Sequence, residues 1–75
     1  MGRKKTKYTK TDACIYIIYC ISRNEFNNIE DLTRSLEISS RQVRRYVSVI
    51  NLALADFMLE EEIEFDKRTG RFIIK

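Results

Sequence analysis

The sequence predicts an α+β fold that is mainly α, with a core of three helices followed by a C-terminal two-stranded β-hairpin. Two observations predict this class. Apolar residues recur at helical spacing in three successive segments between residues 11 and 57, and apolar segments flank a turn-like stretch between residues 62 and 74. A chain of 75 residues has room for one small domain. We therefore expect residues 11–75 to form that domain, after a flexible basic arm at residues 1–10.

The first predicted helix starts near Thr9 or Thr11 and contains an unbroken apolar run over residues 13–21. At about 100° per residue, one face of this helix is apolar and is expected to be buried. That face carries Cys14, Ile17, Ile18 and Ile21. Tyr16 and Tyr19 lie on the opposite face. A strand is the alternative, because the run is rich in β-branched and aromatic residues.

The second predicted helix is short and amphipathic. Asn28 has the side chain of a helix cap, and Asp31 stands in the first turn, where an acidic group is favourable. The apolar face follows the spacing i, i+3, i+4, i+7 and consists of Ile29, Leu32, Thr33 and Leu36. A helix of about eight residues does not stand alone in water, so it must pack against its neighbours.

The third predicted helix follows after a short turn. Ser39 and Gln42 have the Ser-x-x-Gln spacing of a capping box. They place the start of the helix at Ser40 or Arg41, and its apolar periodicity continues to about Phe57. The expected buried stripe consists of Val43, Val47, Ile50, Leu54 and Phe57. Basic side chains then project outward from the first turns.

The C-terminal part of the chain predicts a β-hairpin, with strands near residues 62–65 and 71–74 and a turn at residues 66–70. Acidic residues recur at every second position of the first strand: Glu60, Glu62, Glu64 and Asp66. A calcium or magnesium site is the alternative explanation of this set. Because a flat strand does not make carboxylates converge on an ion, we expect a solvent-facing acidic strand and no metal site.

Charge is distributed unevenly along the chain, although the net charge is only +3. The first ten residues hold five basic residues and no acid, whereas residues 56–66 hold six acids and no base. Between these segments, residues 34–45 hold four arginines against one glutamate. One surface should therefore be basic and another acidic, and a small domain polarised in this way can orient on a polyanion.

The composition argues against several classes of function. The chain has no histidine, which removes the commonest general base and metal ligand, and it has no phosphate-binding loop. Its two cysteines, Cys14 and Cys20, lack a CxxC spacing and are expected to be reduced and to fill the core. No apolar run approaches the roughly 20 residues of a membrane-spanning helix. We expect a cytoplasmic protein with no catalytic activity, no cofactor and no metal.

A membrane anchor has one short pattern in its favour. Residues 1–6 read Met-Gly-x-x-x-Thr beside basic residues, which fits an acylation pattern. The pattern is very short, and Met-Gly starts are common. We therefore expect no membrane association.

The order of elements carries a resemblance to a known family. Residues 29–47 read IEDLTRSLEISSRQVRRYV, in which a short helix leads into a helix that opens with serine and several arginines, and a glycine-bearing hairpin follows. This resembles the bacterial winged helix-turn-helix domains of DeoR-like, BirA-like and WYL-associated regulators. The resemblance covers residues 11–75. It implies a recognition helix at about residues 40–57 in the major groove of DNA, with the hairpin as a wing.

One position departs from the family pattern. Glu37 stands where these families commonly have glycine, which takes the left-handed conformation that the turn needs. A glutamate there would be strained, or the turn would differ. The register at Ser39 and Ser40 consequently stays open by about one residue.

The resemblance implies DNA contacts at matching positions of the third helix and the wing. These positions are Ser40, Arg41, Gln42, Arg44 and Arg45 on the helix, and Lys67, Arg68 and Arg71 on or near the wing tip. Ser48 projects from the same exposed face of the helix. Arginine can pair with guanine edges and glutamine with adenine. Gln42 cannot fold back to cap the helix and also read a base, so both of its roles stay open, and a solvated helix face is the alternative for the arginines.

The N-terminal arm extends the list of candidates. Arg3, Lys4 and Lys5 can lie along phosphates or reach a minor groove, as basic arms do in several DNA-binding folds. A solubilising tail explains the same residues equally well. The arm by itself does not decide between DNA binding and another function.

The expected function is therefore a sequence-specific double-stranded DNA-binding domain of a transcriptional regulator. A homodimer would place two recognition helices about one helical turn apart on a palindromic site. The alternative is a winged-helix protein–protein interaction module in a larger assembly. That module would use the acidic hairpin and apolar residues that are too numerous for a free surface, among them Tyr16, Tyr19, Val49 and Leu52. Packing of these residues against the hairpin is the alternative explanation.

Overall fold

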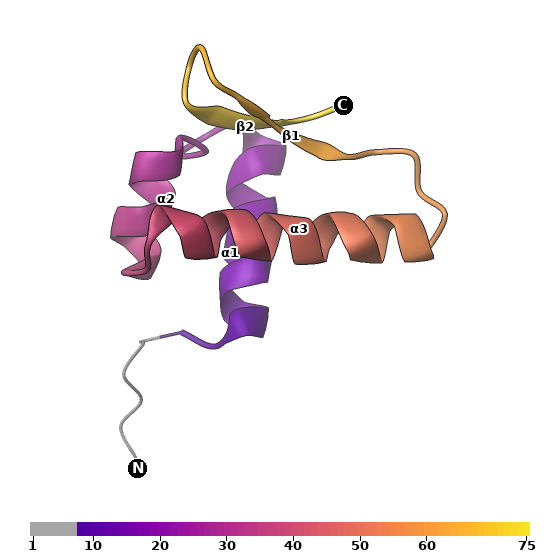
Figure 1. The fold of residues 1–75 in the computed structure, drawn as a ribbon, viewed down its shortest axis with the longest axis horizontal. Coiled ribbons are helices and arrows are strands. Elements are labelled where there is room, and N and C mark those ends of the chain that lie inside the picture. Colours follow the sequence, from indigo (N-terminus) through magenta and orange to yellow (C-terminus); the bar gives the residue numbers. More distant parts are fainter. Residues whose placement is uncertain (1–7) are drawn as a thin grey trace.

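The computed structural model describes residues 8–75 and shows three helices followed by an antiparallel β-hairpin (Figure 1). The elements are α1 (Lys10–Arg23), α2 (Ile29–Leu36), α3 (Ser40–Asp56), β1 (Ile63–Asp66) and β2 (Arg71–Ile74). The predicted fold class is confirmed, and the strand alternative for the first apolar run is wrong. The predictions made for Arg3, Lys4 and Lys5 lie outside the described residues.

The helices cross one another, and the hairpin packs on one side of them. Figure 1 shows α1 running behind α3, with the hairpin over the C-terminal end of α1 and the hairpin turn on the side of α2. The strands pair from Ile63 opposite Ile74 to Asp66 opposite Arg71. The segment 57–62 returns the chain from the far end of α3 to the start of β1.

Side-chain caps start all three helices at the predicted places. The hydroxyl of Thr9 accepts a hydrogen bond from the backbone N–H of Asp12 at 3.1 Å and forms a full capping box with it. Asn28 caps α2, and the Ser39 hydroxyl accepts from the backbone N–H of Gln42 at 3.1 Å. Ser39 is therefore the N-cap of α3, which resolves the open register.

A single apolar core joins all five elements. Its buried members are Ala13, Ile17, Cys20, Ile21, Leu32, Leu36, Val43, Val47, Ile50, Ile63 and Phe72. Cys14 is half-buried and packs against this core. Both cysteines are free thiols, and burial raises the pKa of each of them, which favours the neutral form that fills apolar space. The predicted core-filling role of the cysteines is confirmed.

Two predicted core positions are wrong. Ile18 is 41% exposed, because α1 packs against α3 and β2 through the side that carries Ala13, Ile17 and Cys20. The buried stripe of α1 is thus rotated toward Cys20. Phe57 is 76% exposed, because α3 ends at Asp56 and its last turn extends past the other elements (Figure 1).

The segment between α1 and α2, predicted to be a loop, pairs with the start of β2 through an isolated β-bridge. Phe72 N donates to Asn27 O at 3.0 Å, and Ile29 N donates to Gly70 O at 2.8 Å, on either side of a bridge between Asn28 and Arg71. The Asn27 side chain is 2% exposed, and its Nδ2 donates to Phe72 O at 2.8 Å. These bonds tie the hairpin to the start of α2.

A second asparagine fixes the hairpin to α3. Asn51 Nδ2 donates to Ile63 O at 3.0 Å, and Ile63 N donates to Asn51 Oδ1 at 2.8 Å. One side chain thereby satisfies both backbone groups of the first residue of β1. On the inner face of the hairpin the rings of Phe65 and Phe72 pack with their centroids 5.0 Å apart. The hairpin is therefore held at a defined position against α3.

None of the helices within residues 8–75 has the length and apolar character needed to cross a membrane.

Candidate nucleic-acid interface

The turn between α2 and α3 has the left-handed conformation typical of a glycine, although a glutamate occupies it. Glu37 has φ 59° and ψ 44°, and its backbone N–H donates to Thr33 O. Ile38 N donates to the same carbonyl oxygen at 3.2 Å. The turn thus keeps the left-handed geometry expected from the family resemblance. Glu37 takes the strained conformation, and the turn does not differ to avoid it.

We expect the change Glu37→Gly to stabilise the fold by about 1 kcal/mol relative to Glu37→Ala, because alanine keeps the left-handed strain and glycine removes it. Both variants lose the carboxylate, so their difference isolates the backbone contribution. The free energy of unfolding of each variant is measured by urea titration followed by circular dichroism. Equal stability of the two variants would contradict the assignment of strain to Glu37.

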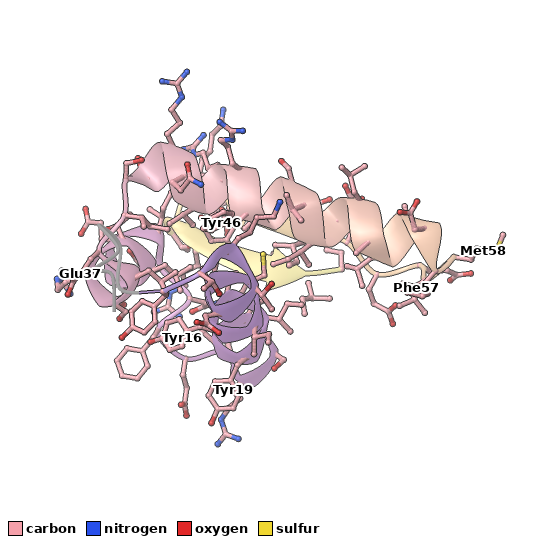
Figure 2. All side chains as sticks on the ribbon, turned by 90° about the horizontal axis from the view of Figure 1, so that it is seen from below. Tyr16, Tyr19, Glu37, Tyr46, Phe57 and Met58 are labelled. Carbon is pink, nitrogen blue, oxygen red and sulfur yellow. The ribbon has the colours of Figure 1, made fainter. Side chains whose placement is uncertain are left out.

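The first turns of α3 present three exposed arginines: Arg41, Arg44 and Arg45. Val43 and Val47 on the opposite side of the helix are buried, and Tyr46 is half-buried on the side toward α1 (Figure 2). Nitrogen-tipped side chains accordingly extend from the N-terminal half of α3 away from α1 (Figure 2). No ion pair within residues 8–75 involves any of the three arginines.

Arg44 connects this basic face to the hairpin. Its guanidinium carbon lies 4.8 Å from the centroid of the Phe65 ring on β1. Arg44 is nevertheless exposed, so its side chain remains accessible to a ligand. The cation–π contact of Arg44 with Phe65 therefore joins α3 to the hairpin.

The remaining predicted positions on α3 divide into two groups. Ser40 and Ser48 are exposed, with Ser40 in the first turn and Ser48 two turns further along the helix. Gln42 is half-buried, and its backbone N–H is the donor to the Ser39 cap. In a full capping box the Gln42 side chain would also accept from the backbone N–H of Ser39. Within residues 8–75, the bond from Gln42 N–H to Ser39 is the one of the two that is found at α3.

The hairpin turn presents the second group of basic side chains. Lys67, Arg68 and Arg71 are exposed. Asp66 accepts a hydrogen bond from the backbone N–H of Arg68 at 3.0 Å, and Gly70 closes the turn with φ 76°. The acidic Asp66 thus serves the backbone of the turn, while the three cations project from it.

The acidic residues of the hairpin region do not form one strand face. Glu64 and Asp66 lie on β1, whereas Glu60 and Glu62 precede it. Glu64 is ion-paired with Lys75 at 3.4 Å. Among residues 8–75, no three side chains of the metal-binding types gather at one place.

The two asparagines that place the wing, Asn27 and Asn51, were not among the predicted site residues. Asn27 stands directly before Asn28, which caps α2. The sequence signal at Asn27 is that it is polar although the cap of α2 does not need it. Asn51 interrupts the otherwise apolar run of residues 49–55 in α3. Both positions are now explained by their bonds to backbone groups of the hairpin.

Comparison of the chain with protein-family models, with curated proteins and with solved structures finds no match. The fold itself is informative. Three helices followed by a C-terminal antiparallel hairpin form a winged-helix-like topology. The three arginines lie on the third helix of this topology. Lys67 and Arg68 lie in the hairpin turn, and Arg71 begins β2.

Proposed function

We propose that this chain is a sequence-specific double-stranded DNA-binding domain of a transcriptional regulator. The observation that carries the proposal is the basic face of α3, where Arg41, Arg44 and Arg45 are exposed and have no acidic partner within residues 8–75. Other cations of the domain, such as Arg34 and Lys75, are paired with acids. Unpaired, outward-facing arginines on one helix suit a polyanionic partner.

The mechanism follows from the dimensions of a helix and of DNA. An α-helix fits the major groove, where arginine donates bidentately to the O6 and N7 atoms of guanine. The exposed N-terminal turn of α3, with Ser40, is the positive end of the helix dipole and would favour a phosphate. Lys67, Arg68 and Arg71 on the wing would then contact phosphates of the flanking backbone. The N-terminal arm, with Arg3, Lys4 and Lys5, would add phosphate contacts. A homodimer would double the number of contacts on a palindromic site.

The salt dependence of binding tests whether the chain binds DNA through the phosphate contacts that this proposal requires. Each phosphate that a protein cation neutralises releases condensed counterions, with a slope of about −0.9 in log K against log salt. Four to six contacts from α3 and the wing give an expected slope of roughly −3.5 to −5.5. The measurement is fluorescence anisotropy of a labelled random-sequence duplex between about 50 and 200 mM salt. Absence of binding at the lowest salt would refute the proposal.

A protein-interaction module is the second candidate, favoured by the apolar C-terminal end of α3. Phe57 is 76% exposed and Met58 is 87% exposed, and Figure 2 shows both at the tip of the molecule farthest from the basic face. Leu52, also on α3, is 66% exposed. Such a surface suits an apolar partner, whose binding would be insensitive to salt and to replacement of Arg45. The anisotropy titration therefore separates the two candidates.

A further inference from the structure

A pocket lies between α1 and the C-terminal end of α2, outside the basic face of α3. Its volume is about 540 Å³. It is lined by Tyr8, Asp12, Ile15, Tyr16, Tyr19, Ser35 and Leu36. Figure 2 shows Tyr16 and Tyr19 on the side of the domain opposite the arginine-bearing side of α3. A ligand in this pocket would leave the proposed DNA interface open.

The lining is mostly aromatic and apolar, and much of it is open to solvent. Tyr19 is 55% exposed, Ile15 is 63% exposed and Tyr8 is 39% exposed. Leu36 forms the floor from the core, because it is only 3% exposed. A ligand that covered these side chains would remove apolar surface from water, which is the general driving force for binding in such a pocket.

The electrostatics of the lining favour a cation. Among residues 8–75, seven line the pocket; three of these are tyrosines, whose ring faces are negative, and Asp12 is the charged one. The capping box holds Asp12 in place at the start of α1. Tyr19 already takes a cation on its ring, since the guanidinium carbon of Arg23 lies 5.4 Å from its centroid. Several aromatic rings beside one carboxylate are the chemistry that binds organic ammonium groups.

We propose that this pocket binds a small lipophilic organic cation, of the aromatic or quaternary ammonium class. The apolar part of the ligand would lie against Ile15 and Leu36, and its cationic group would face the tyrosine rings and Asp12. This site is independent of DNA binding, so the two proposals stand or fall separately.

The test uses benzyltrimethylammonium as the probe, with benzyl alcohol and benzoate as its neutral and anionic counterparts. Binding to the domain is followed by amide and aromatic NMR shifts. We expect a dissociation constant on the order of 1 mM for the cation, as a ligand of about ten heavy atoms reaches. Benzyl alcohol is expected to bind at least about fivefold more weakly, and benzoate not at all. The shifts should fall on α1 and on the end of α2.

Two variants and two matched controls locate the site. Tyr19→Leu keeps apolar bulk but removes a ring. Asp12→Asn removes the charge but keeps a side-chain oxygen that can accept from Thr9 N–H in the capping box. Each is expected to weaken binding of the cation by about three- to tenfold. Phe57→Leu and Asp56→Asn make the same changes far from the pocket and should leave binding unchanged. The melting temperature of each variant verifies folding.

Three results would overturn the proposal. The first is equal affinity for benzyl alcohol and the cation, which would indicate an apolar pocket without charge preference. The second is a shift pattern centred on the acidic segment 60–62 instead of the pocket. The third is unchanged binding by Tyr19→Leu, which tests the site even if Asp12→Asn proves poorly folded.

Discussion

Replacing Arg41 and Arg45 together by alanine is expected to weaken binding to a DNA duplex by about 30-fold or more. Both side chains are exposed on the first turns of α3, and neither has an acidic partner within residues 8–75. A single arginine contact to a base or phosphate contributes on the order of 1–3 kcal/mol, so loss of two is a large effect. Anisotropy titration of the labelled random duplex at constant salt measures it.

A matched double variant shows whether DNA affinity depends on where the positive charges lie or only on how many there are. Arg23→Ala combined with Lys75→Ala also removes two positive charges, but from the end of α1 and the end of the chain, where both residues form exposed ion pairs. We expect this control to lose less than about threefold in affinity, because its charges act on the DNA only at long range. Equal losses in the two double variants would show that net charge alone governs binding and would refute a recognition role for α3.

Replacing Asn27 by alanine is expected to destabilise the fold by about 2–3 kcal/mol. The side chain is 2% exposed and its amide donates to Phe72 O at 2.8 Å and to Asn24 Oδ1 at 3.2 Å. The change leaves a cavity and deprives a buried carbonyl of a donor. For a domain of this size the loss is a large part of the total stability. Urea unfolding measures it, with Ser48→Ala as an exposed control expected to change little.

The isosteric change Asn27→Asp tests the donor role of Asn27 through the pH dependence of the variant's stability. An ionised carboxylate beside the carbonyl oxygen of Phe72 would be repelled and desolvated, so the folded-state pKa of the introduced acid would lie above its unfolded value. Stability of the variant should therefore be highest at low pH, where the protonated acid can donate, and should fall as the pH rises through the folded pKa. A pH-independent difference from the wild type would contradict the buried-donor role of Asn27.

Local sequence was sufficient to predict the helices and their starts. Thr9, Asn28 and Ser39 each cap through a hydrogen bond to a residue two or three positions away, so no distant contact is needed to recognise them. The exposure of Arg41 and Arg45 follows equally directly, because helical spacing places them opposite the buried Val43 and Val47. The outline of the candidate interface was therefore readable from the chain itself.

Other features depend on contacts between residues far apart in the sequence. Asn27 is bonded to a residue 45 positions away, and Asn51 to one 12 positions away. The local sequence shows that each is an unexplained polar residue but does not identify its partner on the hairpin. The contact of Arg44 with Phe65 likewise exists only once the hairpin has docked on α3. Ile18 was predicted to be buried because periodicity defines an apolar stripe but not which edge of it faces the core.

Three capped helices, a hairpin and a basic face on the third helix are encoded locally, since these features depend on hydrogen bonds and residue spacing over short stretches of chain. The position of the wing, the left-handed conformation of Glu37 and the tyrosine-lined pocket arise only when the elements pack together. Packing among α1, α2, α3 and the hairpin selects one arrangement from the several that the local pattern allows, and it can impose a strained backbone where that arrangement needs it.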